Sequence, residues 1–243
     1  NDCNRIRRAV FGQKLSENPL QLEVLKDQEI KVRGNLALVL QTAVFFGKVE
    51  NGTASKEEAV MLRILSPLAK LFTAKDCLKV VSEGLEGLGG IGYLEDSGIP
   101  AYLRNAQVLP IWEGTTNVLC WDVVRALKSL GEEGLDHLLM WLRVKIDRAY
   151  RSDESELRAE KNYGDAYKYL IIIYTELSNI LFDLVKGKSV EVKYQLSLRN
   201  IVFAFSHVCV AVILLRFASD PVLVGDNARF YAREDHKNTF IEW

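Results

Sequence analysis

The residues best suited to chemistry in this 243-residue chain lie in the segment Pro110-Ile-Trp-Glu-Gly-Thr-Thr-Asn117. Glu113 stands between an aromatic residue, Trp112, and Gly114, directly before a run with helical periodicity. A carboxylate placed at a helix N-terminus can act as a general base, and the helix dipole favours negative charge there. An ordinary acidic residue in a first helical turn has the same placement. The segment is therefore a candidate site whose role depends on the rest of the chain.

Three further motifs precede this segment: Arg8-Ala-Val-Phe-Gly12, Gly89-Gly-Ile-Gly-Tyr93 and Tyr102-Leu-Arg-Asn105. A guanidinium suits a diphosphate, and glycines allow a ligand to approach the backbone closely. Each motif also has a simpler explanation. Arg8 lies beside Arg5 and Arg7 and can be a solvated charge, while threonine and asparagine are common helix-capping residues.

Helical periodicity dominates the elements that must position these motifs. We expect a helix to end at Phe11-Gly12, and a long amphipathic helix over Pro19 to Lys48. Asn51-Gly52 predicts a turn, with Ser55 capping a helix that ends near Phe72 and is kinked or broken at Pro67.

The next helix is predicted over 74–88, ending at a glycine cluster, and a loop with one short helical turn over 101–105 fills residues 93–112. Helical segments follow over 114–130, 135–151, 156–186 and 190–218. No stretch shows sustained strand alternation, and Leu170 to Tyr174 lies inside a helical frame. The fold class is all-α, with one bundle over 1–130 and a second helical set over 131–243, divided at Gly131 to Gly134.

Composition narrows the classes of function. A formal net charge of -1 argues against a broadly basic surface for nucleic acids. The four cysteines form no CxxC pair and the three histidines form no pattern, so no metal site is expected. Scattered thiols and no signal-peptide pattern indicate an intracellular protein. Residues 201–218 are apolar but short for a membrane span and contain Arg216, which favours a buried bundle helix.

The order and approximate spacing of these motifs resemble the C-terminal helical domain of acyl-CoA dehydrogenases. Trp112 and Asn117, together with the long extension after residue 131, are most similar to the adaptive-response AidB-type branch. The likeness is good over 1–130 and looser beyond. It implies the acyl-CoA dehydrogenase C-terminal bundle, FAD as cofactor and an acyl-CoA thioester as substrate. The family's N-terminal helical domain and middle β domain, which forms one wall of the site, have no counterpart in this sequence.

The resemblance also implies roles for individual residues. Glu113 would remove the proton α to the thioester carbonyl, its own N–H would bind the thioester oxygen, and Trp112 and Gly114 would lie beside the substrate. The residues that would contact FAD are Arg8, Phe11, Glu86, Gly87, Leu88, Gly89, Gly90, Thr115 and Asn117.

Several of these contacts would reach a neighbouring subunit's flavin, so a homodimer or homotetramer is expected. Glu86 departs from the glutamine common in the family, and an acidic group near a phosphate argues against contact through its side chain. Asn105 likewise replaces the aspartate that usually follows Arg104 in the family.

Three hypotheses stay open at this stage. The first is the C-terminal part of an FAD-dependent acyl-CoA dehydrogenase, located in the cytoplasm or the mitochondrial matrix. The second is a protein of the same ancestry that binds acyl-CoA, flavin or DNA with little turnover. DNA is a minor candidate because the basic residues near the C-terminus alternate with acidic ones, which weakens attraction to phosphates. The third is a helical oligomerisation module whose motif residues are structural.

Overall fold

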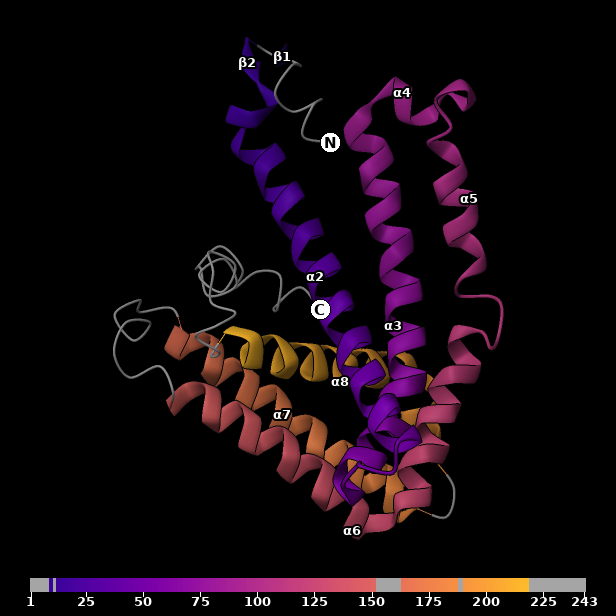
Figure 1. The fold of residues 1–243 in the computed structure, drawn as a ribbon, viewed down its shortest axis with the longest axis vertical. Helices are drawn as coiled ribbons and strands as arrows, with labels where there is room; N and C mark the ends of the chain where they lie inside the picture. Colours follow the sequence, from indigo (N-terminus) through magenta and orange to yellow (C-terminus); the bar gives the residue numbers. More distant parts are fainter. Residues whose placement is uncertain (1–8, 11, 152–162, 188–189, 219–243) are drawn as a thin grey trace.

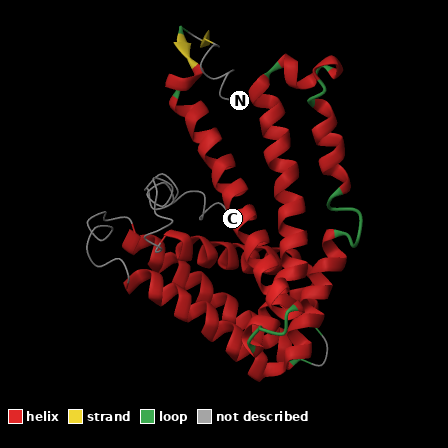
Figure 2. Ribbon diagram, viewed as in Figure 1, coloured by secondary structure: helices red, strands yellow, loops and turns green. Residues whose placement is uncertain are grey.

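The computed structural model describes residues 9–10, 12–151, 163–187 and 190–218. Almost all of them are helical, which confirms the all-α fold class (Figure 2). The long helices α2 and α3 and the shorter α5 rise side by side, while α7 and α8 lie across the lower part of the fold (Figure 1). The elements in order are β1 (Ala9–Val10), β2 (Gln13–Lys14), η1 (Leu15–Glu17), α2 (Pro19–Glu50), α3 (Lys56–Leu88), α4 (Gly90–Tyr93), η2 (Glu95–Ser97), α5 (Pro100–Val108), α6 (Thr116–Arg151), α7 (Tyr163–Lys186) and α8 (Val192–Ala218).

Local signals set the boundaries of α2 and of the start of α3, as predicted. Asn18 caps α2 by accepting a hydrogen bond from the N–H of Gln21 at 3.2 Å. Ser55 and Glu58 form a reciprocal capping box, in which each side chain accepts from the other residue's N–H. This box satisfies two backbone donors that a helix start otherwise leaves without partners.

The sequence predicted a kink or a break at Pro67 and a helix end near Phe72; the break and the helix end are wrong, because α3 runs as one helix from Lys56 to Leu88. A proline inside a helix costs about 3 kcal/mol, since it removes a hydrogen bond and crowds the preceding turn. Here Pro67 is itself buried, between Leu65 and Leu68, neither of which has any exposed side-chain surface. Burial of this apolar face offsets the local cost, so tertiary packing overrides the proline.

The helix predicted before Phe11-Gly12 is also wrong over the residues that the structure describes. Ala9 and Val10 form a short strand that pairs antiparallel with Gln13 and Lys14. Gly12 adopts a φ of 80° in the two-residue connection. A positive φ in such a connection is typical of a tight hairpin, and glycine adopts it without steric cost.

The region after α3 contains more helix than predicted. α3 ends at Gly89, where φ is 67°, and the short α4 follows at once. The predicted turn over 101–105 is instead the nine-residue α5, which begins at Pro100. Proline is favoured at a first helical position because its missing N–H has no intrahelical partner there.

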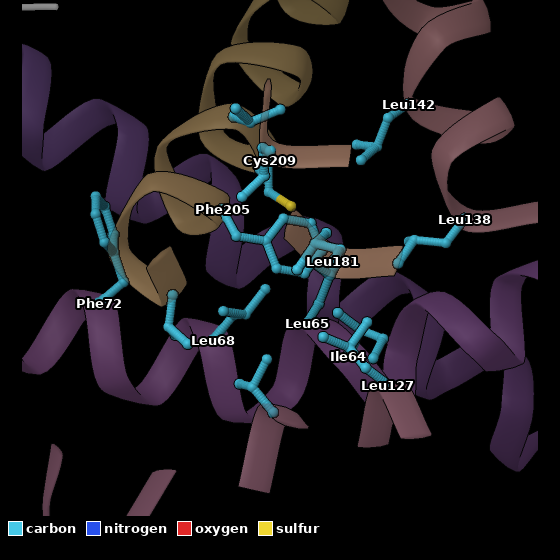
Figure 3. Packing of buried hydrophobic residues seen from close by; sticks show 14 of the residues in the cluster. Ile64, Leu65, Leu68, Phe72, Leu127, Leu138, Leu142, Leu181, Phe205 and Cys209 are labelled. Carbon is cyan, nitrogen blue, oxygen red and sulfur yellow. The ribbon is translucent and has the colours of Figure 1, made fainter. Parts of the chain in front are cut away.

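The long α6 contains a kink at Gly131, whose φ of 67° and ψ of -173° are not helical. This glycine lies where the sequence predicted an interruption between 131 and 134. Residues from both sides of it enter one buried cluster, which also includes side chains of α2, α3, α7 and α8 (Figure 3). The division into bundles over 1–130 and 131–243 stays a prediction.

The core is apolar and closely packed. Leu38, Ile64, Leu65, Leu142 and Phe205 have no exposed surface. Gly34 brings α2 and α8 together, because a Cβ at this position would lie 2.8 Å from Cγ1 of Val210. A larger residue at 34 would push the two helices apart.

α8 is the one helix in the described ranges that is long and apolar enough to cross a membrane. Of its most apolar window, 61% is buried inside the protein. A core helix of a bundle passes the same test of length and composition, and α8 packs against α2, α3, α6 and α7.

A layer of polar side chains lies where α2, α3 and α8 meet. Asp76 is 2% exposed, and its burial raises the pKa of its carboxyl group, while Lys79 and Lys31 oppose that shift. His207 packs edge-on against Phe72, with ring centroids 4.7 Å apart. Burial, helped by the charges of Lys79 and Lys31, lowers the pKa of His207 to about 4.

Candidate functional site

The candidate site is centred on the turn that joins α5 to α6. The N–H groups of Ile111 and Trp112 both donate to the carbonyl of Val108, at 2.9 and 3.1 Å, and so close the end of α5. The carbonyl of Thr115 accepts from the N–H of Leu119 at 3.0 Å and so opens α6. Glu113 and Gly114 lie between these two anchored ends.

Glu113 has an unusual backbone conformation. Its φ of 52° makes it the one non-glycine residue with a positive φ in the part of the chain that the structure describes. A left-handed conformation costs a residue with a Cβ about 1–2 kcal/mol, and such residues are concentrated at functional sites. Gly114, with a φ of 107°, continues the turn. The N–H groups of both residues are without hydrogen-bond partners among the described residues.

Lys70 of α3 is a member of this site that the sequence motifs did not indicate. Its ammonium group donates a hydrogen bond to the carbonyl of Gly114, 44 residues further along the chain. Partial burial lowers the pKa of Lys70, and the attraction of the Glu113 carboxylate opposes this shift. The only local signal for Lys70 is a single charge inside the apolar run from Leu68 to Phe72.

Trp112, Thr115 and Asn117 lie around Glu113 with exposed side chains. Trp112 is 56% exposed, so it presents a flat apolar surface rather than anchoring the core. Thr115 directly precedes α6, and Asn117 is in its first turn, as expected for capping positions. The hydroxyl and amide groups of these side chains can donate and accept hydrogen bonds.

The glycine segment lies at the other end of α5. Glu86, Gly87 and Leu88 form the last turn of α3, and Gly89 ends that helix with its N–H bonded to the carbonyl of Glu86 at 2.8 Å. A Cβ on Gly90 would meet nothing within 4 Å, so its backbone is open to close approach.

Gly92 has a different reason to be glycine. A Cβ there would lie 2.1 Å from the carbonyl oxygen of Leu85, which no side chain can tolerate. The contact therefore fixes α4 against the end of α3.

The structure does not bring the two parts of the predicted site together within this chain. The nine residues of α5 separate the glycine segment from Glu113, a rise of about 13 Å at 1.5 Å per residue. Figure 1 shows α4 at the upper end of α3 and the α5–α6 turn well below it. Arg8 and Phe11 lie outside the described residues.

Arg104 pairs with an acid that lies earlier in the chain. It donates to both carboxylate oxygens of Glu95, at 2.8 and 3.2 Å. This pair ties α5 to η2.

The remaining reactive groups are not arranged as a metal or nucleophile site. In the ranges described, no group of three or more His, Cys, Asp or Glu side chains is placed to hold a metal ion. Burial raises the pKa of Cys120 to about 11 and that of Cys209 to about 12. His137 is exposed, whereas His236 and the basic residues near it lie outside the described residues.

Comparisons with known proteins agree on one family. The profile of the family described as "Acyl-CoA dehydrogenase, C-terminal domain" matches residues 6–128. "Acyl-CoA dehydrogenase family member 11" of Caenorhabditis elegans is 34% identical over 225 residues, which are 91% of this chain and 35% of that protein. "Putative acyl-CoA dehydrogenase AidB" of Escherichia coli is 35% identical over 159 residues, or 63% of this chain and 28% of that protein.

A solved structure supports the fold likeness. The crystal structure of Caenorhabditis elegans ACDH-11 in complex with C11-CoA superposes with a TM-score of 0.73 at 32% identity. The match covers 94% of this chain and 38% of that one. This chain therefore spans about a third of the length of the relatives that it matches.

Proposed function

Because this chain belongs to the acyl-CoA dehydrogenase family through its C-terminal domain, we propose that it forms the helical wall of an FAD-dependent acyl-CoA dehydrogenase site. The likeness to AidB and to the nematode family member 11 favours the AidB-like branch. Within this site Glu113 is the base that removes the α proton of an acyl-CoA thioester.

The observation that carries the proposal is the backbone of Glu113. A left-handed turn at a glutamate has a steric cost that a glycine would avoid, yet the chain keeps a carboxylate there. The turn points an exposed carboxylate away from the core at the start of α6. It also leaves the N–H groups of Glu113 and Gly114 available to an oxyanion.

The chemistry divides between the chain and the cofactor. FAD, when bound, accepts the hydride from the β carbon of the substrate. Glu113 takes the α proton on its carboxylate, and the N–H of Glu113 donates to the thioester oxygen as negative charge develops on it. Such a donor, aimed in advance at the developing charge, lowers the barrier to enolate formation.

The residues around the turn fit a flavin ring. Thr115 and Asn117 supply neutral hydrogen-bonding groups and Trp112 a flat apolar face, all exposed beside Glu113. The open backbone at Gly90 suits a cofactor that lies close to the chain. Since α5 separates Gly90 from Thr115, we assign the segment from Glu86 to Gly90 to the flavin of a second subunit. The assembly is then a homodimer or a homotetramer.

Flavin absorbance tests this proposal in the full-length protein. We expect a yellow protein whose flavin is bleached by acyl-CoA, and a loss of about 100-fold or more in the bleaching rate in Glu113→Gln. Glu133→Gln, which removes an exposed carboxylate elsewhere on α6, is the matched control and is expected to bleach at the normal rate. Full activity in Glu113→Gln would refute the role of Glu113.

Binding without turnover is the second candidate, and one observation favours it. The Glu113 side chain is exposed, and this chain alone does not shield it from water. A solvated carboxylate is a weak base toward a carbon acid. Retention of flavin and acyl-CoA without bleaching in the full-length protein would favour this alternative over catalysis.

A further inference from the structure

Lys70 links the middle of α3 to the turn that carries Glu113. Its ammonium donates to the carbonyl of Gly114 at 2.5 Å, across a separation of 44 residues. Gly114 directly follows Glu113, so the bond fixes the peptide plane between Gly114 and Thr115, one residue beyond the Cα that carries the Glu113 side chain. We propose that Lys70 is a positioning residue, which holds the Glu113 turn in its left-handed conformation and so aims its carboxylate and N–H groups. This inference rests on the proposed function for its consequence in catalysis, but the tether itself can be tested separately.

The turn needs such a tether. Two consecutive residues with φ of 52° and 107° are not held by a helix or a sheet, and the side chain of Glu113 is exposed. The hydrogen bonds that close α5 and open α6 stop at Trp112 and start again at Thr115. Among the described residues, the bond from Lys70 is the one side-chain hydrogen bond to the backbone between these two ends.

Lys70 is well placed to act as a rigid anchor. It is half-buried on α3, directly between Ala69 and Leu71, which are 8% and 1% exposed. A hydrogen bond from a charged donor to a carbonyl is stronger than a neutral one. The negative charge of Glu113 also favours the charged form of Lys70, which keeps this donor protonated beside the turn.

Amide hydrogen exchange tests the tether without relying on any enzymatic activity. In the full-length protein, Lys70→Met keeps most of the side-chain stem and removes the ammonium group. We expect amide exchange at Trp112 and Leu119, the hydrogen-bonded N–H groups on either side of the turn, to accelerate by about tenfold or more, since a hydrogen bond to a charged group is lost. Lys70→Arg keeps a charged donor and is expected to restore much of the protection.

Lys128→Met is the matched control. Lys128 also donates from its ammonium to a distant carbonyl, that of Gly187 at 2.7 Å, directly after the end of α7. Its loss is expected to leave exchange at Trp112 and Leu119 unchanged. If Lys70→Met also leaves it unchanged, the tether does not hold the turn and the inference is overturned.

Kinetics of the flavin-loaded protein test the consequence. Misplacement of a catalytic group by about 1 Å costs about 100-fold in rate, so we expect kcat to fall by about that factor in Lys70→Met with little change in KM. Lys70→Arg should recover part of kcat, and Lys128→Met should retain it. A rise in KM at constant kcat would instead mean that Lys70 binds substrate, which would overturn the positioning role. If the wild-type flavin is never bleached by acyl-CoA, the proposed function fails, while the exchange result still decides the tether.

Discussion

The two ends of α3 are built from similar residues but lie in different surroundings. From Met61 to Asp76 the helix contributes ten buried residues, and from Cys77 to Leu88 it contributes none. α2 runs beside it and shows the same division, with no buried residue before Gln28. The glycine segment lies at the unburied end of α3, and the residues Trp112 to Thr115 are largely exposed as well. The part of α3 from Met61 to Asp76 therefore lies in the buried core. The region around its C-terminal end instead exposes apolar side chains, including Ile91, Tyr93 and Tyr102.

This contrast indicates which part of the chain can be stable alone and which part awaits a partner surface. Exposed apolar side chains that gather on one region mark an interaction site more often than scattered ones do.

The largest expected effect tests the buried core. Leu65→Ala removes a side chain with no exposed surface and is expected to lower the free energy of unfolding by about 2–5 kcal/mol. Leu36→Ala, on the outer face of α2 where the side chain is 56% exposed, should change it by less than about 0.5 kcal/mol. Urea unfolding of the two variants measures both values. An equally large loss in Leu36→Ala would mean that an assembly buries this face.

The second effect tests the polar layer at the boundary between the two ends. The pKa of His207 is about 4 in the folded protein against 6.5 as its ordinary value. Between these pH values the unfolded chain binds a proton that the folded chain does not, so stability falls as pH falls from 6.5 to 4. The loss due to His207 is about 3 kcal/mol.

His207→Leu should therefore flatten the dependence of unfolding free energy on pH in that window. The raised pKa of Asp76 acts in the opposite direction, because it stabilises the fold at low pH and the contribution is lost as pH rises. Asp76 is present in both proteins, so the difference between their pH curves isolates His207. Parallel curves would show that His207 is not buried in the neutral state.

The third, smaller effect is on stability and has opposite signs at two glycines of α2, one packed against α8 and one facing open space. Gly34→Ala places a Cβ 2.8 Å from Val210, and this overpacking is expected to destabilise the fold by about 1–3 kcal/mol. Gly47→Ala lies in the same helix with nothing within 4 Å, and should stabilise it by up to about 1 kcal/mol. Thermal unfolding separates the two. Destabilisation in both would point to a second contact on the open face of α2.

The helix caps give the smallest effect. Ser55→Ala removes the capping box of α3 at the core end and should cost about 1 kcal/mol in global unfolding free energy. Asn18→Ala removes a similar cap from the unburied start of α2, where the first turns can fray without unfolding the core. We expect its effect mainly as faster amide exchange near residue 20. Equal global losses would contradict the independence of the two ends.

Elements with strong local signals could be predicted from the sequence. Pro19, Asn51 and the Ser55 capping box define α2 and the start of α3, and Gly131 marks the kink in α6. The continuity of α3 through Pro67 could not be predicted, because it depends on packing between distant segments. The hairpin at Gly12 and the start of α5 at Pro100 had local signals, in a positive-φ turn and a first-position proline, that the helical periodicity obscured.

The candidate site divides in the same way. The motif at Trp112-Glu-Gly-Thr identified a turn that the structure shows to be unusual, and its order with the glycine segment predicted the family. Lys70 was not found, since its partner is 44 residues away and its one local signal is a single charge inside an apolar run. The pairing of Arg104 with Glu95 was also not predicted, because it depends on how the chain folds between the two residues.

The left-handed backbone at position 113 also restricts what the chain can hold there. Glycine, asparagine and aspartate adopt this conformation at modest cost, whereas valine, isoleucine and threonine are disfavoured because their branched Cβ crowds the backbone. The backbone conformation at position 113 therefore limits which residues can replace Glu113, whatever the function of its side chain. Without the proton abstraction proposed for Glu113, glycine, asparagine or aspartate would fit this turn at less steric cost than glutamate.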